Sequence, residues 1–178
     1  MLPVEPRNSE PGNVVLTGFM GTGKTTVGRI LAERLGCDFV DTDEMIESRA
    51  GTAAQIFAES GEGSFRELER SVALELAGRT GLVIATGGRM MLDRACADRL
   101  EPGACVVCLT ASVETIIERV ADTASRPLLA GSHPAQRVRR VRELLDERAA
   151  AYGRYTPVDT EGLSPQQVAE RIVSLLGQ

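Results

Sequence analysis

Short, uninterrupted runs of apolar residues recur along the chain and predict buried β-strands. Most of these runs are rich in valine, isoleucine or leucine, as strands that are covered on both faces usually are. The expected strands lie at residues 13–17, 39–43, 82–85, 104–109 and 156–159.

Between these runs, apolar residues recur at three- and four-residue spacing, which predicts amphipathic helices. The expected helices lie at residues 26–35, 64–78, 91–100, 112–120, 135–151 and 164–176. A shorter helix should open at a capping box formed by Thr52 and Gln55, and Gly61 and Gly63 should end it. This alternation predicts an α/β fold, a parallel sheet with helices on both faces.

The remaining segments divide the chain into a tail and one folded unit. Residues 1–12 contain three prolines and a glycine and are expected to be a disordered N-terminal tail. Residues 13–178 are then a single domain that is large enough for a hydrophobic core. Within it, residues 122–134 carry two prolines and a glycine, which predicts a mobile loop.

The stretch from Gly18 to Thr25 matches the phosphate-binding pattern G-x-x-x-x-G-K-[ST] between a predicted strand and a predicted helix. Backbone N–H groups of the loop and of the first helical turn should point at phosphates, and the helix dipole adds positive charge. Lys24 would reach the β- and γ-phosphates, and the Thr25 hydroxyl would hold Mg²⁺. The expected nucleotide-binding residues here are Gly21, Thr22, Gly23, Lys24, Thr25 and Thr26.

Lys24 is the only lysine in a chain that has nineteen arginines. Codon bias toward arginine would explain the other positions. A compact ammonium suits the phosphates better than a planar fork does, which explains why this position alone has lysine.

Polar residues follow two further strands. Asp41 and Asp43 close the second strand two residues apart, so their side chains should leave on the same face. Asp41 could support Mg²⁺, and Asp43 could accept the proton of an attacking hydroxyl. Gly87 and Gly88 follow the third strand and should expose N–H groups to a ligand. Because ligands bind at the carboxyl ends of parallel strands, all of these residues are expected to converge.

Composition narrows the range of partners. The net charge of −5 argues against a general nucleic-acid or membrane partner, and the aromatic content of 3% argues against a base-stacking surface. No run of membrane-spanning length and no signal-peptide pattern is present, so we expect a cytoplasmic protein. The four cysteines are expected to be buried and reduced, with Cys105 and Cys108 on opposite faces of one strand.

Most of the arginines fit a solvated helix face, as in the charged helix at 135–151. Arg126 differs, because it lies in the proline-containing loop at 122–134. There it could close over a transferring phosphoryl group as an arginine finger from the same chain.

Taken together, these segments resemble the shikimate kinases, which are P-loop kinases of the nucleoside monophosphate kinase fold. The resemblance spans about residues 14–176. It rests on the phosphate loop, Asp41-Thr42-Asp43, Phe65-Arg66-x-x-Glu69, Thr86-Gly87-Gly88, Arg126-Pro127-Leu128-Leu129 and Arg148-x-x-x-Tyr152.

The resemblance implies a three-layer fold whose five-stranded parallel sheet has the order 2-3-1-4-5. It also implies a substrate-binding helical region near residues 43–75 and a lid near 122–134. The implied reaction is ATP-dependent phosphorylation of the 3-hydroxyl of shikimate, with Mg²⁺ as cofactor, in the biosynthesis of aromatic amino acids. We expect a monomer.

The resemblance also implies roles for single residues. Asp43 would bind the shikimate hydroxyls and act as the base or orienter. Arg66 and Arg148 would grip the substrate carboxylate, because planar guanidinium forks suit it, with a backbone contribution from Gly88. Arg119 would lie against adenine, and Arg126 would serve phosphoryl transfer.

Two positions depart from the family pattern. Arg89 stands where the family usually has a third glycine; its N–H is retained, and its side chain is expected along the rim of the substrate pocket. The segment 161–165 lacks the arginine that some members carry beside adenine.

Two other functions compete with this interpretation. A kinase of another small hydroxy acid, such as gluconate, is the nearest enzyme, but the Asp-Thr-Asp and Phe-Arg segments argue against it. A non-catalytic nucleotide-binding module would not need Asp43, Arg66 and Arg148 together. A GTPase switch is excluded, because its Asn-Lys-x-Asp motif requires a second lysine.

Overall fold

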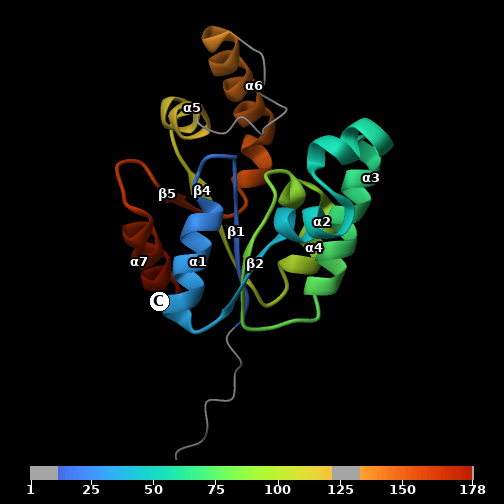
Figure 1. The fold of residues 1–178 in the computed structure, drawn as a ribbon. Helices are drawn as coiled ribbons and strands as arrows, with labels where there is room; N and C mark the ends of the chain where they lie inside the picture. Colours follow the sequence, from blue (N-terminus) through green and yellow to red (C-terminus); the bar gives the residue numbers. More distant parts are fainter. Residues whose placement is uncertain (1–11, 122–132, 178) are drawn as a thin grey trace, which may run out of the picture.

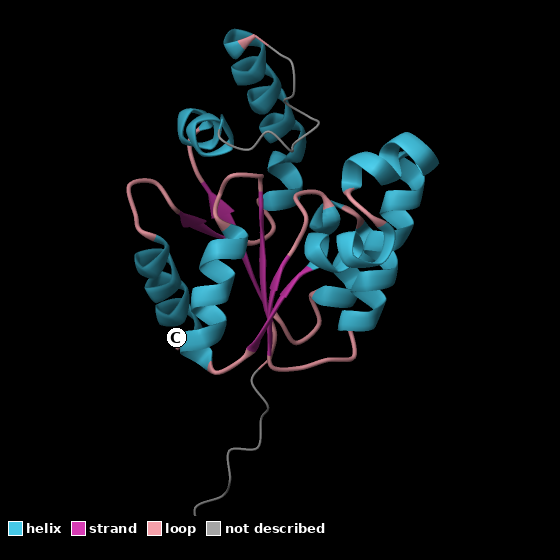
Figure 2. Ribbon diagram, viewed as in Figure 1, coloured by secondary structure: helices cyan, strands magenta, loops and turns pink. Residues whose placement is uncertain are grey.

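A computed structural model of the protein describes residues 12–121 and 133–177. A five-stranded sheet lies at its centre, in the order β2-β3-β1-β4-β5 with every neighbouring pair parallel (Figures 1 and 2). The strands are β1 Val14–Gly18, β2 Asp38–Asp41, β3 Leu82–Ala85, β4 Cys105–Thr110 and β5 Thr156–Asp159. The predicted fold class and strand order are therefore confirmed.

Helices cover both faces of the sheet and its carboxyl end (Figure 1). On one face lie α1 Lys24–Leu35 and α7 Pro165–Leu176, and on the other lie α2 Thr42–Ala50, α3 Ala53–Leu76 and α4 Arg94–Leu100. At the carboxyl end of the sheet, α5 Val113–Ala121 packs against α6 Pro134–Tyr152. None of the described helices is both long and apolar enough to cross a membrane.

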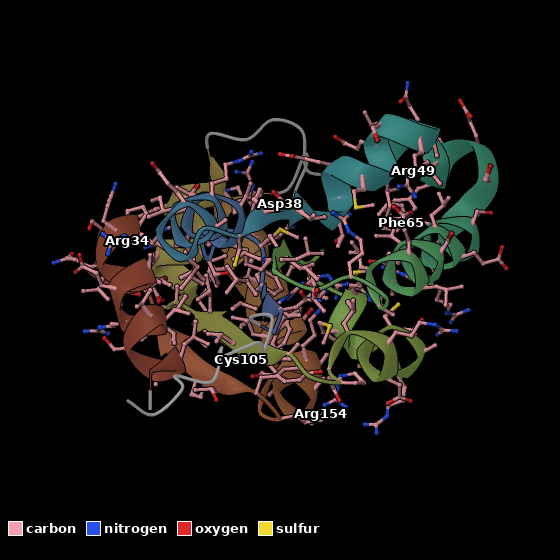
Figure 3. All side chains as sticks on the ribbon, turned by 90° about the horizontal axis from the view of Figure 1, so that it is seen from below. Arg34, Asp38, Arg49, Phe65, Cys105 and Arg154 are labelled. Atoms are coloured by element: carbon pink, nitrogen blue, oxygen red, sulfur yellow. The ribbon has the colours of Figure 1, made fainter. Side chains whose placement is uncertain are left out.

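The central strand shows why apolar runs without alternation predicted the sheet correctly. Val15 packs in the core under α3 and α4, whereas Val14 and Leu16 pack in the core under α1 and α7. A strand that is buried on both faces has no polar face to alternate with. Figure 3 shows the labelled arginines Arg34 and Arg154 near the outer edge of the molecule.

Several element boundaries differ from the prediction. A kink at Gly61 (φ 79°, ψ 170°) does divide α3, as expected, but Gly63 lies inside the helix that follows. The helix predicted at residue 91 begins at Arg94 instead, because Asp93 accepts a hydrogen bond from the Ala95 N–H and caps it. The capping box of Thr52 and Gln55 is present as predicted.

All four cysteines are free thiols. Cys105 and Cys108 pack in the cores on opposite faces of the sheet, as predicted. Burial was predicted for all four, but Cys37 and Cys105 are only partly buried. Cys37 lies in the short connection between α1 and β2, and Cys105 is the first residue of β4. Cys96 and Cys108 are fully buried, and burial raises the pKa of each thiol to about 11.

The difference in burial among the four cysteines predicts the order in which a thiol reagent labels them. At pH 8 a thiol with a pKa of about 11 is ionised to only about one part in 10³, and thiolates are the reactive species. We therefore expect a maleimide to label Cys37 at least about 10²-fold faster than Cys96 or Cys108. Timed quenching and peptide mapping would measure this, with unfolded protein as the control that equalises all sites. Rapid labelling of Cys108 in the folded protein would contradict the described packing.

The expected tail at 1–12 and the expected lid at 122–134 lie almost wholly outside the described residues. Of these two segments the structure describes only Gly12, His133 and the backbone of Pro134.

Candidate active site

The loop between β1 and α1 has the geometry of a phosphate cradle. Its glycines Gly21 and Gly23 take φ of 78° and 93°, a backbone region that side chains rarely adopt. The Thr22 hydroxyl donates to the Phe19 carbonyl at 2.8 Å and closes the turn. The loop and the first turn of α1 line a cleft, and N–H groups in the first turn of a helix have no partner within the helix, which suits an anion.

Lys24 is the first residue of α1, and its side chain folds back over the loop. Its Nζ donates to the carbonyl oxygens of Gly18 at 2.8 Å and Phe19 at 2.9 Å. The ammonium is thus held at the mouth of the cradle, where phosphate oxygens would replace these carbonyls as partners.

The cleft above the loop has a volume of about 510 Å³. It brings together residues that follow the carboxyl ends of most of the strands, as the sequence predicted. Besides the loop and α1, the lining includes Asp41, Asp43, Thr86, Gly88, Arg119, Thr160, Leu163, Pro165 and Val168.

Thr25 and Asp41 place two side-chain oxygens beside the loop. The Thr25 hydroxyl donates to Asp41 Oδ2 at 2.7 Å. The other oxygen, Asp41 Oδ1, caps α2 by accepting from the N–H groups of Asp43 and Glu44. Hard oxygen donors of this kind fit Mg²⁺, which usually takes one or two protein ligands and fills its shell with water and phosphates. Among the described residues no cluster of three or more carboxylate, histidine or cysteine ligands exists.

Asp43 reaches the cleft by a different route from the predicted one. The second strand ends at Asp41, and Asp43 lies in the first turn of α2, so strand alternation does not apply. Asp43 nevertheless lines the same cleft as Asp41. It lies against Gly87, where an added Cβ would collide with Asp43 Oδ1, so the absence of a side chain at residue 87 makes room for this carboxylate.

The backbone groups of Gly87 and Gly88, which follow β3, make different contacts from those predicted. The Gly87 N–H donates to the Thr42 hydroxyl at 2.9 Å and is buried, so it is not available to a ligand. Gly88 does border the cleft, but its carbonyl is occupied, accepting from the Tyr152 hydroxyl at 2.6 Å and from Arg148 Nη1 at 3.4 Å. The expectation of an exposed N–H at Gly87 is therefore wrong.

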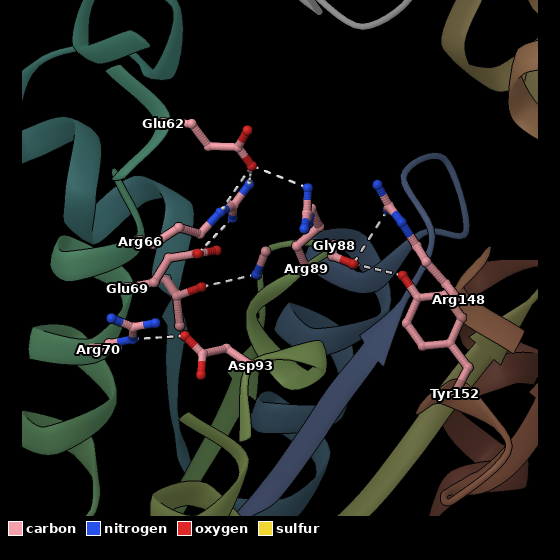
Figure 4. Close-up of polar contacts among 11 residues, drawn as sticks. Glu62, Arg66, Glu69, Arg70, Gly88, Arg89, Asp93, Arg148 and Tyr152 are labelled. Atoms are coloured by element: carbon pink, nitrogen blue, oxygen red, sulfur yellow. Dashed lines mark hydrogen bonds and ion pairs between the residues drawn. The ribbon is translucent and has the colours of Figure 1, made fainter. Parts of the chain in front are cut away.

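Arg66 lies on α3 between two carboxylates (Figure 4). Its Nη1 pairs with Glu69 Oε2 at 2.6 Å, and its Nη2 pairs with Glu62 Oε1 at 2.9 Å. Glu69 is buried, and burial raises the pKa of its carboxyl, an effect that the Arg66 ion pair offsets only in part. These contacts hold the guanidinium of Arg66 in one orientation.

Arg148 approaches the same region from α6 (Figure 4). It is 4% exposed, and its guanidinium lies 5.0 Å from the ring centroid of Phe19. Together with Tyr152, it is tied to the Gly88 carbonyl, and burial raises the pKa of Tyr152. A cation that is stacked on an aromatic ring in a buried setting is pre-oriented for an anion.

Arg119 joins α5 to the loop after β5. Its Nη1 donates to the Thr160 hydroxyl at 2.9 Å and to the Gly21 carbonyl at 3.3 Å, and its Nη2 donates to the Thr160 carbonyl at 3.2 Å. The carboxylate of Glu161 accepts from Ser112, which further ties this loop to α5. The cleft that Arg119 lines also contains the apolar residues Leu163, Pro165 and Val168, which suit the face of a nucleobase.

The predicted residues are oriented by four others for which the sequence predicted no role: Thr42, Glu62, Glu69 and Tyr152. Three of them were signalled by helical spacing, since Glu62 precedes Arg66 by four residues, Glu69 follows it by three, and Tyr152 follows Arg148 by four. Arg126, the predicted arginine finger, lies outside the described residues.

Comparisons with known proteins agree on one family. The family model "SKI: Shikimate kinase" matches residues 20–177. The shikimate kinase of Thermodesulfovibrio yellowstonii is 43% identical over 163 residues, which cover 90% of this chain and 92% of that protein. A solved structure, shikimate kinase from Acinetobacter baumannii in complex with shikimate, has a TM-score of 0.86 at 36% identity and covers 93% of this chain and 92% of its own. Shikimate kinase from Bacteroides thetaiotaomicron has a TM-score of 0.87 at 29% identity, with coverage of 94% and 99%.

Proposed function

Because this chain belongs to the shikimate kinase family, we propose that the cleft above its phosphate loop is the site in which ATP phosphorylates the 3-hydroxyl of shikimate. The protein phosphorylates shikimate, and this reaction is a step in the biosynthesis of aromatic amino acids. The observation that carries the site assignment is that Lys24, Asp43 and Gly88 line one cleft. A gluconate kinase or a non-catalytic nucleotide-binding module is not favoured by this family membership.

We assign the loop side of the cleft to the nucleotide. The N–H groups of residues 21–26 and the ammonium of Lys24 would hold the phosphates, and Arg119 with its apolar neighbours would receive the base. Thr25 and Asp41 would hold Mg²⁺, which when bound neutralises charge on the β- and γ-phosphates.

We assign the opposite side of the cleft to shikimate. Arg66 and Arg148, which lie outside the residues that line the cleft, would bind its carboxylate, and the backbone of Gly88 and the Arg89 N–H would border it. Asp43 would orient the 3-hydroxyl and accept its proton as the oxygen attacks the γ-phosphorus. The bond between the γ-phosphorus and the β–γ bridging oxygen breaks, and ADP leaves with that oxygen. Arg126 would stabilise the charge that develops on the transferring group.

We further propose that the protein acts as a monomer with a single domain at residues 13–178. The four free thiols are in keeping with a reducing compartment, and we place the protein in the cytoplasm.

A coupled assay of ATP turnover tests this function. The protein should consume ATP when shikimate is present and much less with quinate, gluconate or nucleoside monophosphates. ATP turnover that did not depend on shikimate would refute the proposed substrate.

Arg66→Ala and Arg148→Ala should each weaken shikimate binding while leaving ATP binding nearly intact. Each charged hydrogen bond that is lost costs about 1.5–3 kcal/mol, which is roughly one to two decades of affinity. Titration calorimetry with each ligand would measure this, and Arg139→Ala, an exposed arginine on α6, is the matched control. Unchanged shikimate affinity in both variants would contradict the carboxylate clamp. Melting curves would separate lost contacts from lost folding, which matters for the buried Arg148.

A further inference from the structure

One carboxylate oxygen of Glu62 lies between two guanidinium groups (Figure 4). Glu62 Oε1 accepts from Arg66 Nη2 at 2.9 Å and Arg66 Nε at 3.3 Å, and from Arg89 Nη1 at 3.0 Å. Two cations from different elements, α3 and the loop after β3, thus converge on a single anion. The same two cations would converge equally well on a carboxylate from a ligand.

The two carboxylates that pair with Arg66 differ in how easily they can leave. The side chain of Glu69 is 2% exposed, and it would lose its compensating charge inside the protein if it parted from Arg66. The side chain of Glu62 is 58% exposed, so on leaving it would regain full hydration at little cost. An incoming anion would therefore replace Glu62 and leave Glu69 in place.

The backbone around Glu62 favours such a movement. Glu62 stands between Gly61, where α3 is kinked, and Gly63. A Cβ added at either glycine would meet no atom of another segment within 4 Å, so no other element packs against these two positions. The carboxylate can swing away without disturbing the core.

Arg89 is placed to act on the substrate directly. It follows Gly88, whose carbonyl receives Arg148 and Tyr152, and Figure 4 shows its side chain between those of Arg66 and Arg148. Its side chain is 51% exposed, so it is free to follow an anion into the cleft.

We propose that Glu62 occupies the place of the substrate carboxylate between Arg66 and Arg89, and that substrate binding displaces it so that Arg89 becomes a direct ligand of the substrate. The inference rests on the proposed function, because it concerns the same carboxylate site. The Arg89 side chain then binds the substrate, and Glu62 competes with the substrate carboxylate for Arg66 and Arg89. One carboxylate replaces another, so Arg66 is never left without a counter-charge.

The exchange predicts that two substitutions act in opposite directions. Glu62→Gln removes the competing charge and should lower the dissociation constant of shikimate by about two- to fivefold. Arg89→Gln removes a half-exposed cation and should raise that constant by about three- to tenfold. Both substitutions should change the dissociation constant of shikimate more than turnover at saturating shikimate, because the exchange concerns the substrate carboxylate and not the transferring group.

The experiment compares these two variants, the double variant and the wild type by calorimetry and coupled assay. The matched controls are Glu170→Gln and Arg34→Gln, an ion pair of similar exposure that joins α1 and α7 on the other face of the sheet. The ligands are shikimate and its methyl ester, which keeps the hydroxyls and lacks the negative charge. The ester should respond to neither substitution.

Each outcome decides one point. Weaker shikimate binding in Glu62→Gln would show that Glu62 only positions Arg66, and would overturn the exchange. No effect of Arg89→Gln in the Glu62→Gln background would show that Arg89 acts only by holding Glu62, and would overturn its direct role. Equal effects on shikimate and its methyl ester would likewise refute a carboxylate contact. If the wild type itself showed no shikimate-dependent turnover, the proposed function would fail instead.

Discussion

Asp43→Asn should lower turnover of shikimate by about 10²- to 10⁴-fold, the usual contribution of a positioned general base. Asparagine keeps the shape of the side chain but cannot accept the hydroxyl proton. Asp43 lies in the first turn of α2, where its side chain borders the cleft and fits against Gly87. The change is therefore expected to leave the fold and the nucleotide site intact, since Asp41, which caps the helix, is untouched.

Single-turnover kinetics of the purified variant would measure the chemical step, and a melting curve with ATP titration would check the fold. Glu44→Gln is the matched control, an exposed carboxylate on the next residue that pairs with Arg29 on α1. Near-normal turnover in Asp43→Asn would show that Asp43 is neither the base nor an essential orienter.

Lys24→Met should lower the rate of phosphoryl transfer by about 10²- to 10³-fold or more, which is the usual cost of removing one preorganised stabilising donor. Methionine preserves most of the length of the side chain and removes the charge that stabilises the β- and γ-phosphates. Because the Lys24 ammonium already bonds two loop carbonyls, the loop could also relax slightly, and ATP affinity should fall as well.

Chemical labelling tests the same residue without mutation. Only Lys24 and the N-terminal amine can react with a lysine-directed reagent, since the chain has no other lysine. Mg-ATP should protect Lys24 and not the N-terminus, and shikimate alone should protect it much less. Peptide mapping with and without each ligand gives the result. Equal labelling of Lys24 in the presence and absence of Mg-ATP would mean that the loop does not hold the nucleotide.

Much of the fold could be predicted because its signals are local. A strand that is buried on both faces must be apolar throughout, and a helix on a sheet must be apolar along one stripe, so each element is visible in its own residues. The boundaries that were wrong lie where a side chain decides the end of a helix. Asp93 caps α4 three residues later than periodicity suggested, and Asp41 ends β2 by capping α2.

The candidate site could be predicted only in part. Asp41 and Asp43 do share the cleft, but through a strand-to-helix junction and not through alternation along a strand. The Gly87 N–H was expected to face a ligand, yet the Thr42 hydroxyl accepts it from a segment 45 residues away. A hydrogen bond between distant segments depends on how the crossovers bring them together, and no local pattern records it.

The sequence by itself determined the α/β architecture, the phosphate loop and the identity of the charged residues that can serve a phosphoryl transfer to an anionic substrate. These follow from the spacing of apolar residues, from glycines that permit positive φ, and from a lone lysine in the loop. Only the tertiary structure decided which cations are already paired. Arg89 shares Glu62 with Arg66, and Arg148 stacks on Phe19, because Arg89 and Arg148 come to these partners from other elements of the fold. The energy of a charge depends on its neighbours and its exposure, and both exist only once the chain has folded.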